Sequence, residues 1–161
     1  MNYEIFTNLP PQIGTFLIAM LPIGELRAAI PFALTVYKMG ILESFIWAVA
    51  GNMFPVLFLL IGLEKASNYL MAKSPSANNF FSWLFKKTRN KFIASHEKWG
   101  ELALIIFVAI PLPMTGAWTG SVAAYIFGIP RKNAFLNILW GVMIAGIIVT
   151  ILTRGIVHIF Q

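Results

Sequence analysis

An uncharged run of 28 residues, Leu102–Ile129, is interrupted near its centre by Pro111-Leu112-Pro113. Two prolines at positions i and i+2 remove backbone donors and clash with the preceding turn, so a continuous helix is not expected there. The pieces on either side are each shorter than the roughly 20 residues that cross a bilayer as a helix. We therefore predict a re-entrant helical hairpin at 101–129, which turns near the membrane centre and leaves on the side from which it entered. Its break residues are Pro111, Pro113 and Gly116.

The first part of the chain has a similar interruption. Residues 5–24 carry no charge, and Pro22-Ile23-Gly24-Glu25 then breaks an apolar stretch that resumes after Arg27. The same argument predicts a hairpin at 10–39. Its break residues are Pro22, Gly24 and Pro31.

Two other uncharged runs are long enough to cross a bilayer. Residues 45–63 form a run of 19 and residues 133–153 a run of 21, which is the length that a spanning helix needs. We predict transmembrane helices at 41–63 and 132–154. Each of them follows one of the two hairpins.

The two halves of the chain also share their spacing. Prolines and glycines recur at separations of 88–90 residues: Pro22 with Pro111, Pro31 with Gly120, Gly40 with Gly128, and Gly51 with Gly141. Because a re-entrant hairpin does not change sides, one hairpin and one span per half would invert the second half, as in many secondary transporters. The prediction is an all-α integral membrane protein with a single domain over 1–161, built as an inverted repeat. The first repeat is 9–64, a basic amphipathic connector is 65–100, and the second repeat is 101–157.

The composition supports a membrane protein and argues against soluble classes. Hydrophobic residues make up 58% and charged residues 11% of the chain, with no Asp and no Cys, against roughly 45–50% and 25% in an ordinary globular chain. The mean hydropathy is +0.77. No pattern typical of a nucleophile triad, a phosphate loop or a metal site is present, so we expect no enzymatic activity, no cofactor and no metal. The net charge of +6 fits lipid headgroup contacts better than nucleic acid.

The distribution of Lys and Arg predicts the orientation. Residues 64–101 hold seven of the twelve Lys and Arg residues. The positive-inside tendency places the connector at 65–100 in the cytoplasm and both termini outside, in a multi-pass protein of the cell membrane. Within the connector, aromatic and basic residues alternate at 80–91. This segment is either an interfacial amphipathic helix on anionic lipid or an ordinary basic loop.

Glu25 is the most informative single residue. A carboxyl near the bilayer centre is costly and is a functional candidate by default. Burial away from water favours its neutral form, so Glu25 could carry a proton. Alternatively, Glu25 caps its own half-helix or pairs with Arg27, although residues i and i+2 do not share a helix face.

The second half of each hairpin would direct a helix N-terminus to the membrane centre, where it could bind an anion. Arg27 is a candidate anion ligand or partner of Glu25, Thr115 a candidate N-cap, and Trp118 an aromatic wall of the site. Thr119 is a further candidate ligand on the same segment as Trp118. Asn52 and Asn137 lie within the predicted spans, where polar side chains more often bond between helices than bind substrate.

Two strings resemble the signature of the small multidrug export protein family: PIGELRAAIPFAL at 22–34 and PLPMTGAWTGSVAAYIFG at 111–128. The resemblance extends from about Leu9 to Thr153. The positions that match the family are Glu25, Leu26, Arg27, Ile30, Pro31, Pro111, Pro113, Thr115, Gly116, Trp118, Thr119 and Gly120. The family is similar in turn to the DedA superfamily, whose proposed fold is two re-entrant hairpins, each followed by a transmembrane helix.

The resemblance implies a transport function. DedA proteins are associated with proton-coupled transport and with movement of polyprenyl-phosphate lipids. Their second hairpin typically carries arginines around its proline motif, whereas residues 102–129 contain none. A phosphate group would therefore depend on Arg27 and the helix termini alone.

Three functions stay open at this point. The first is a proton-coupled small-molecule exporter, with Glu25 as proton carrier and its site between the hairpin tips. The second is a DedA-like translocase or scramblase of anionic lipid, and the third is a membrane scaffold that transports nothing. Because two spans and two hairpins enclose little volume, we also expect a homo-oligomer, most simply a dimer.

Overall fold

Two long helices, α4 (Ile41–Lys73) and α8 (Arg131–Ile159), form the centre of the molecule. They are seen in a computed structural model that describes residues 9–76, 78–83, 86, 97–112 and 115–159, all without a strand. Both helices are long and apolar enough to cross a membrane, and only 39% of each apolar stretch is buried. The core helix of a soluble protein would be buried for most of its length, so this outward apolar surface favours contact with lipid. The prediction of two long apolar helices is confirmed.

Among the described residues, four shorter helices pack against the long ones. They are α2 (Pro11–Met20), α3 (Glu25–Thr35), α6 (Glu97–Ala109) and α7 (Ala117–Phe127). Helix α2 begins with a proline at its first position, where the missing N–H would have had no intrahelical partner. Helix α7 is followed by Gly128, whose φ of 72° is the left-handed conformation that closes many helices.

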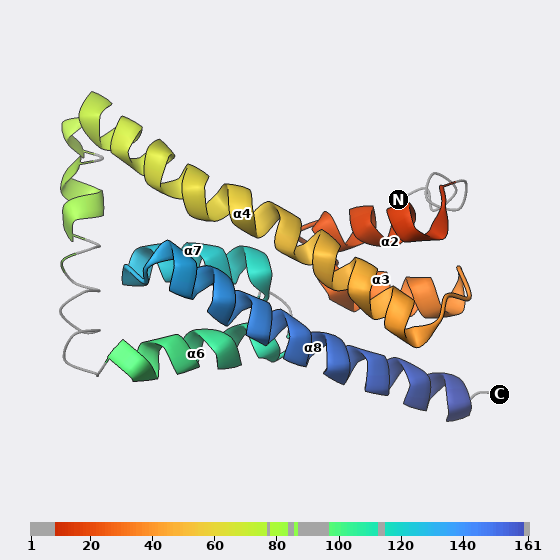
Figure 1. Ribbon diagram of the computed structural model, residues 1–161. Coiled ribbons are helices and arrows are strands. Elements are labelled where there is room, and N and C mark those ends of the chain that lie inside the picture. The colour runs from red at the N-terminus through yellow and green to blue at the C-terminus, as the bar shows by residue number, and fades with distance from the viewer. Residues whose placement is uncertain (1–8, 77, 84–85, 87–96, 113–114, 160–161) are drawn as a thin grey trace.

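The helices pack in matching pairs. Helices α2 and α3 form one pair of short helices, and α6 and α7 form the other. The first helix of each pair packs on one long helix, α2 on α4 and α6 on α8. The second helix of each pair, α3 or α7, contacts both long helices. The α2–α3 pair lies at the end of the molecule where α4 begins and α8 ends, and the α6–α7 pair lies at the other end (Figure 1). The breaks within the two pairs therefore approach each other between the long helices.

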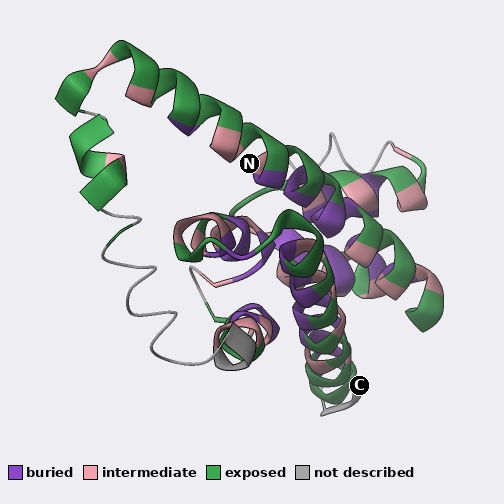
Figure 2. Ribbon diagram, turned by 60° about the vertical axis from the view of Figure 1, so that its left-hand side comes forward, coloured by how far each residue is buried: buried purple, intermediate pink, exposed green. Residues whose placement is uncertain are grey.

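Small residues allow this close packing. Alanines with no exposed surface occur on α2, α3, α4, α7 and α8, and the buried faces turn inward (Figure 2). A Cβ at Gly51 on α4 would lie 2.3 Å from the carbonyl oxygen of Phe16 on α2. A Cβ at Gly141 on α8 would lie 2.9 Å from the carbonyl oxygen of Ile105 on α6. These two glycines thus serve the same purpose, because each lets a short helix lie directly against a long one.

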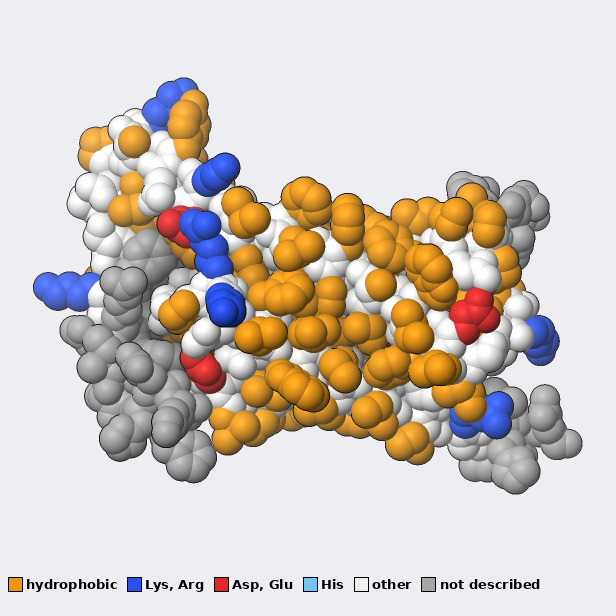
Figure 3. Space-filling view, viewed as in Figure 1, with side chains coloured by type: hydrophobic (Ala, Val, Ile, Leu, Met, Phe, Trp, Pro, Cys, Tyr) orange, Lys and Arg blue, Asp and Glu red, His pale blue; other side chains and the backbone are white. Residues whose placement is uncertain are grey.

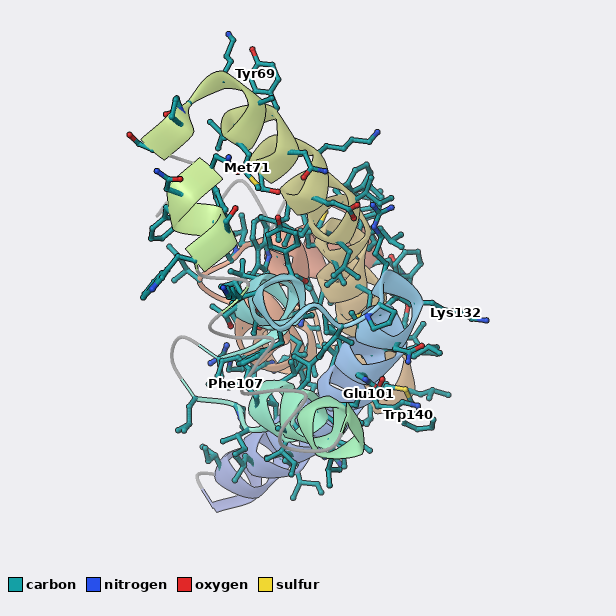
Figure 4. The ribbon with its side chains drawn as sticks, turned by 90° about the vertical axis from the view of Figure 1, so that its left-hand side faces the viewer. Tyr69, Met71, Glu101, Phe107, Lys132 and Trp140 are labelled. Atoms are coloured by element: carbon teal, nitrogen blue, oxygen red, sulfur yellow. The ribbon has the colours of Figure 1, made fainter. Side chains whose placement is uncertain are left out.

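The outer surface is divided into zones. Apolar side chains cover the middle of the visible face, and charged side chains gather at its two ends (Figure 3). At the end where α8 begins, Arg131 Nε donates to Glu64 Oε2 at 2.8 Å, and Asn133 Nδ2 donates to Glu101 Oε1 at 2.8 Å. Figure 4 looks onto this end, with Lys132 pointing away from the helices.

Some elements differ from the expected bounds. Helix α4 continues to Lys73, ten residues past the expected end at 63. Pro31 lies inside α3 rather than at the break; its neighbours Ile30 and Ala33 are fully buried, and this packing holds the helix together across the one hydrogen bond that proline removes. Pro113 and most of 80–91 lie outside the described residues.

Candidate functional site

The break between α2 and α3 meets the break between α6 and α7 at the centre of the molecule. Glu25, the first residue of α3, is only 3% exposed. Its φ of 50° is in the left-handed region, which a residue with a side chain adopts only at a cost when the surroundings require it. Strain of this kind is often found at functional sites.

The Glu25 carboxylate caps a helix of the other pair. Its Oε1 atom accepts a hydrogen bond from the backbone N–H of Trp118, in the first turn of α7, at 3.3 Å. A helix N-terminus carries unpaired N–H groups and roughly half a positive charge, so a carboxylate there is stabilised. The anion at this helix terminus is therefore a group of the protein itself.

Gly116 makes room for the carboxylate. This residue has a φ of 135° and a ψ of −165°, and it stands immediately before α7. A Cβ placed on it would lie 2.0 Å from Glu25 Oε2. Sequence reasoning identified Gly116 as a break residue but missed this contact, because the two residues meet only in the folded structure.

Arg27 binds across the two breaks. Its Nη1 donates to the carbonyl oxygen of Leu112, and its Nη2 donates to the carbonyl oxygen of Thr115. Nη2 also lies 3.3 Å from Glu25 Oε2. The guanidinium thus satisfies two carbonyl groups of a segment that cannot form regular helical bonds, and it balances the buried carboxylate.

On a regular helix Glu25 would not pair with Arg27, because residues i and i+2 point in different directions. The pair forms here because Glu25, with its positive φ, does not have helical backbone geometry. Its side chain consequently turns toward both Arg27 and α7.

The expectation that Thr115 caps α7 is wrong. The residue before α7 is Gly116, and no side chain at that position caps the helix. The Thr115 hydroxyl instead lies 2.7 Å from the carbonyl oxygen of Ile110 and 2.8 Å from that of Leu112. It stabilises the turn after α6, while Glu25 supplies the cap.

The other predicted residues are only partly brought together. The Trp118 indole N–H donates to the carbonyl oxygen of Met20 at 3.1 Å, which ties α7 to the end of α2. The Thr119 hydroxyl is 3.4 Å from the carbonyl oxygen of Gly116, just before its own helix. Of the two asparagines predicted as candidates, Asn52 lines a cavity with Glu25 and Arg27, whereas Asn137 does not.

This arrangement suits a charged carboxylate. The hydrogen bonds from Trp118 and from Arg27 are both donated to Glu25. A proton on Glu25 would remove its attraction to the guanidinium and weaken the cap on α7. Within the described residues, no group of three or more acidic or histidine side chains could hold a metal ion.

The fold and the site define a class of protein: a helical membrane protein with two helices of spanning length and a buried ion pair where its broken segments meet. The chain belongs to the family described as "Putative small multi-drug export protein", whose profile matches residues 25–148. The match begins at Glu25 and includes all of α4, and α8 as far as residue 148. No curated protein and no solved structure matches the chain.

Proposed function

We propose that the protein exports small molecules across the cell membrane in exchange for protons, with Glu25 as the proton carrier. The family description supports export of small molecules. One observation carries the rest: a buried carboxyl, paired with Arg27, joins the two places where the helices break. Protonation at this point would act on both pairs of short helices at once.

In this proposal the two pairs of short helices are re-entrant hairpins that enter from opposite membrane faces. Their position at opposite ends of the long helices supports this placement (Figure 1). The matching contacts support an inverted repeat, since α2 relates to α4 as α6 relates to α8. The connector is then cytoplasmic and both termini are outside, as the Lys and Arg distribution favours.

The proposed cycle depends on two states of Glu25. The charged carboxylate holds the breaks together through Arg27 and the N-terminus of α7. The neutral carboxyl releases this attraction, so the broken segments separate and open a path toward one side of the membrane. A proton can shift such an equilibrium only because it binds one state better than the other.

The structure offers less support for anionic lipid as the substrate. A phosphate group would need the donors of Arg27, and three of its five N–H groups already bind the carbonyl oxygens of Leu112 and Thr115 and the Glu25 carboxylate. The N-terminus of α7 is likewise occupied by Glu25. A cationic or neutral substrate does not have to displace these contacts.

Transport can be tested in proteoliposomes with an imposed pH gradient, using ethidium as the transported probe. We expect Glu25→Gln to abolish gradient-driven flux while expression and oligomeric state stay unchanged. Glu43→Gln is the matched control, because Glu43 also lies in the first turn of a helix and accepts a bond from Gln12 at 2.6 Å. Equal flux in wild type and Glu25→Gln would refute the proton-carrier role, and unfolding of Glu25→Gln would favour a structural one.

The topology can be tested separately, because the chain has no native cysteine. Single cysteines at Glu101, Gly128 and Gln161 would be labelled with an impermeant thiol reagent from either side. We expect 101 and 128 to react from the same side and 161 from the opposite side. Labelling of 101 and 128 from opposite sides would replace the hairpin with a kinked span.

The proposed dimer follows from the small size of the chain. Light scattering in mild detergent should give the mass of two or more copies. A single monodisperse monomer would exclude it.

A further inference from the structure

Asn52, near the middle of α4, has no exposed surface. Neither its Oδ1 nor its Nδ2 atom finds a hydrogen-bond partner within the part of the chain that the structure describes. Leaving a buried donor or acceptor unsatisfied costs about 1–3 kcal/mol for each group. An asparagine in such a position therefore indicates a polar partner that is not among the described residues.

Asn52 and the buried ion pair border the same small cavity. Asn52 lines a cavity of about 10 Å³ together with Glu25 and Arg27. The remaining walls come from α3, α6, α7, α8 and the break after α6, and their side chains are apolar or glycine. A cavity of this size holds about one water molecule.

The chemistry of the walls favours water over a metal cation. Arg27 contributes a positive charge and has no acceptor, so it would repel a cation. It is the only charged group besides Glu25 among the residues that line the cavity. A water molecule needs two to four polar partners, and Asn52 and Glu25 together offer that number.

We propose that this cavity binds a single water that links the Asn52 amide to the Glu25 carboxyl. This inference rests on the proposed proton-carrier role of Glu25 and deepens it. While Glu25 is charged, the Asn52 Nδ2 group donates to the water, and the water donates to the carboxylate. When Glu25 takes up a proton, its O–H donates to the water, and the water donates to Asn52 Oδ1.

Asn52 thus supports both protonation states with one side chain, because an amide has a donor and an acceptor. The neutral carboxyl needs an acceptor for its new O–H. Among the side chains that line the cavity, only Asn52 has one free. Arg27 stabilises the charged form of Glu25. Asn52 acts as a positioning residue for the neutral form of Glu25, through the water.

The test is infrared difference spectroscopy of the full-length protein between neutral and acidic pH. The carbonyl stretch of neutral Glu25 is identified by its loss in Glu25→Gln. In Asn52→Leu we expect this band to move to higher wavenumber, because the neutral carboxyl loses its hydrogen-bonded partner. We also expect loss of a water O–H stretch that is sensitive to exchange into ¹⁸O-labelled water.

Asn137→Leu is the matched control. Asn137 is also a buried asparagine in a long helix with an unpartnered Nδ2, but it does not line the cavity. It should leave both bands unchanged. Equal shifts in the Asn52 and Asn137 variants would overturn the proposal, as would an unchanged spectrum in Asn52→Leu.

A second variant covers the case in which Asn52→Leu does not fold. Asn52→Ser keeps a hydroxyl that can donate and accept, and α4 already buries Ser44 completely. We expect a smaller shift of the carbonyl band and a retained water band. An unmoved carbonyl band in Asn52→Ser would overturn the proposal.

The two proposals fail in different ways. If a Glu25 carbonyl band forms in acid but does not respond to Asn52, only the water-linked site is refuted. If no Glu25 band forms at any pH at which the protein is folded, the proton-carrier role is refuted and the water-linked site with it.

Discussion

Replacing Gly116 with alanine tests the meeting of the two breaks most directly. The new Cβ would lie 2.0 Å from Glu25 Oε2, so the carboxylate would have to leave the N-terminus of α7. Its charge-assisted hydrogen bond is worth about 1.5–3 kcal/mol. The φ of 135° and ψ of −165° at this position add about 1–3 kcal/mol for any residue with a side chain. We therefore expect Gly116→Ala to lower the free energy of unfolding by about 2.5–6 kcal/mol.

Thermal unfolding in detergent, followed by circular dichroism, would measure this loss as a fall in Tm on the order of 10 °C for a chain of this length. Gly62→Ala in α4 is the control, because a Cβ at Gly62 meets nothing within 4 Å. There we expect a gain of about 0.5–1 kcal/mol from the better helix former. A Gly116→Ala protein as stable as wild type would refute the placement of Glu25 against Gly116.

The two parts of the cost can be separated in a double-mutant cycle. In a Glu25→Ala background no carboxylate stands in the way of the new methyl group. Gly116→Ala should then cost only the backbone part, about 1–3 kcal/mol. Equal costs in both backgrounds would mean that the two residues do not interact.

Three further substitutions give expected outcomes that unfolding measurements can check. Arg27→Met should lower the free energy of unfolding by about 3–5 kcal/mol near neutral pH, because it leaves the buried Glu25 carboxylate without its partner. This loss of stability should be smaller in acid, where Glu25 is neutral. An equal loss at both pH values would contradict the pairing. Trp118→Phe should lose about 0.5–1.5 kcal/mol with the indole bond to the end of α2, so a larger loss would point to a packing role. Arg131→Ala should cost less than about 1 kcal/mol, because its pair with Glu64 is exposed.

The long helices could be predicted because their signal is local. In an apolar environment an uncharged run of 19 or 21 residues forms a helix, because a helix satisfies every backbone hydrogen bond within the segment. The prolines at Pro22 and Pro111 likewise indicated where the shorter helices end, because their effect on the backbone is local. Pro31 shows the limit of this reasoning, because tertiary packing keeps α3 intact around it.

The site was predicted only as a set of residues. Glu25 and Arg27 stood out because charges in an apolar stretch are costly. Their partners could not be derived, because Trp118 is 93 residues from Glu25 and Leu112 is 85 residues from Arg27. Two of these partners are backbone groups, the N–H of Trp118 and the carbonyl of Leu112, and the identity of a side chain does not reveal which backbone group is free. The error at Thr115 has the same cause, since the cap on α7 comes from the other half of the chain.

The separation between these partners also matters while the protein is being made. A ribosome adds about 5–20 residues per second, so Glu25 waits about 5–20 s before Trp118 exists to bind it. During that interval the first pair of short helices has a carboxylate and a guanidinium but none of the groups from the second break. Complete burial of these charges in lipid would be costly at that stage. The first pair of short helices should therefore reach its final position only after the second pair has been synthesised. A chain truncated after α4 should be degraded more quickly than the full-length protein.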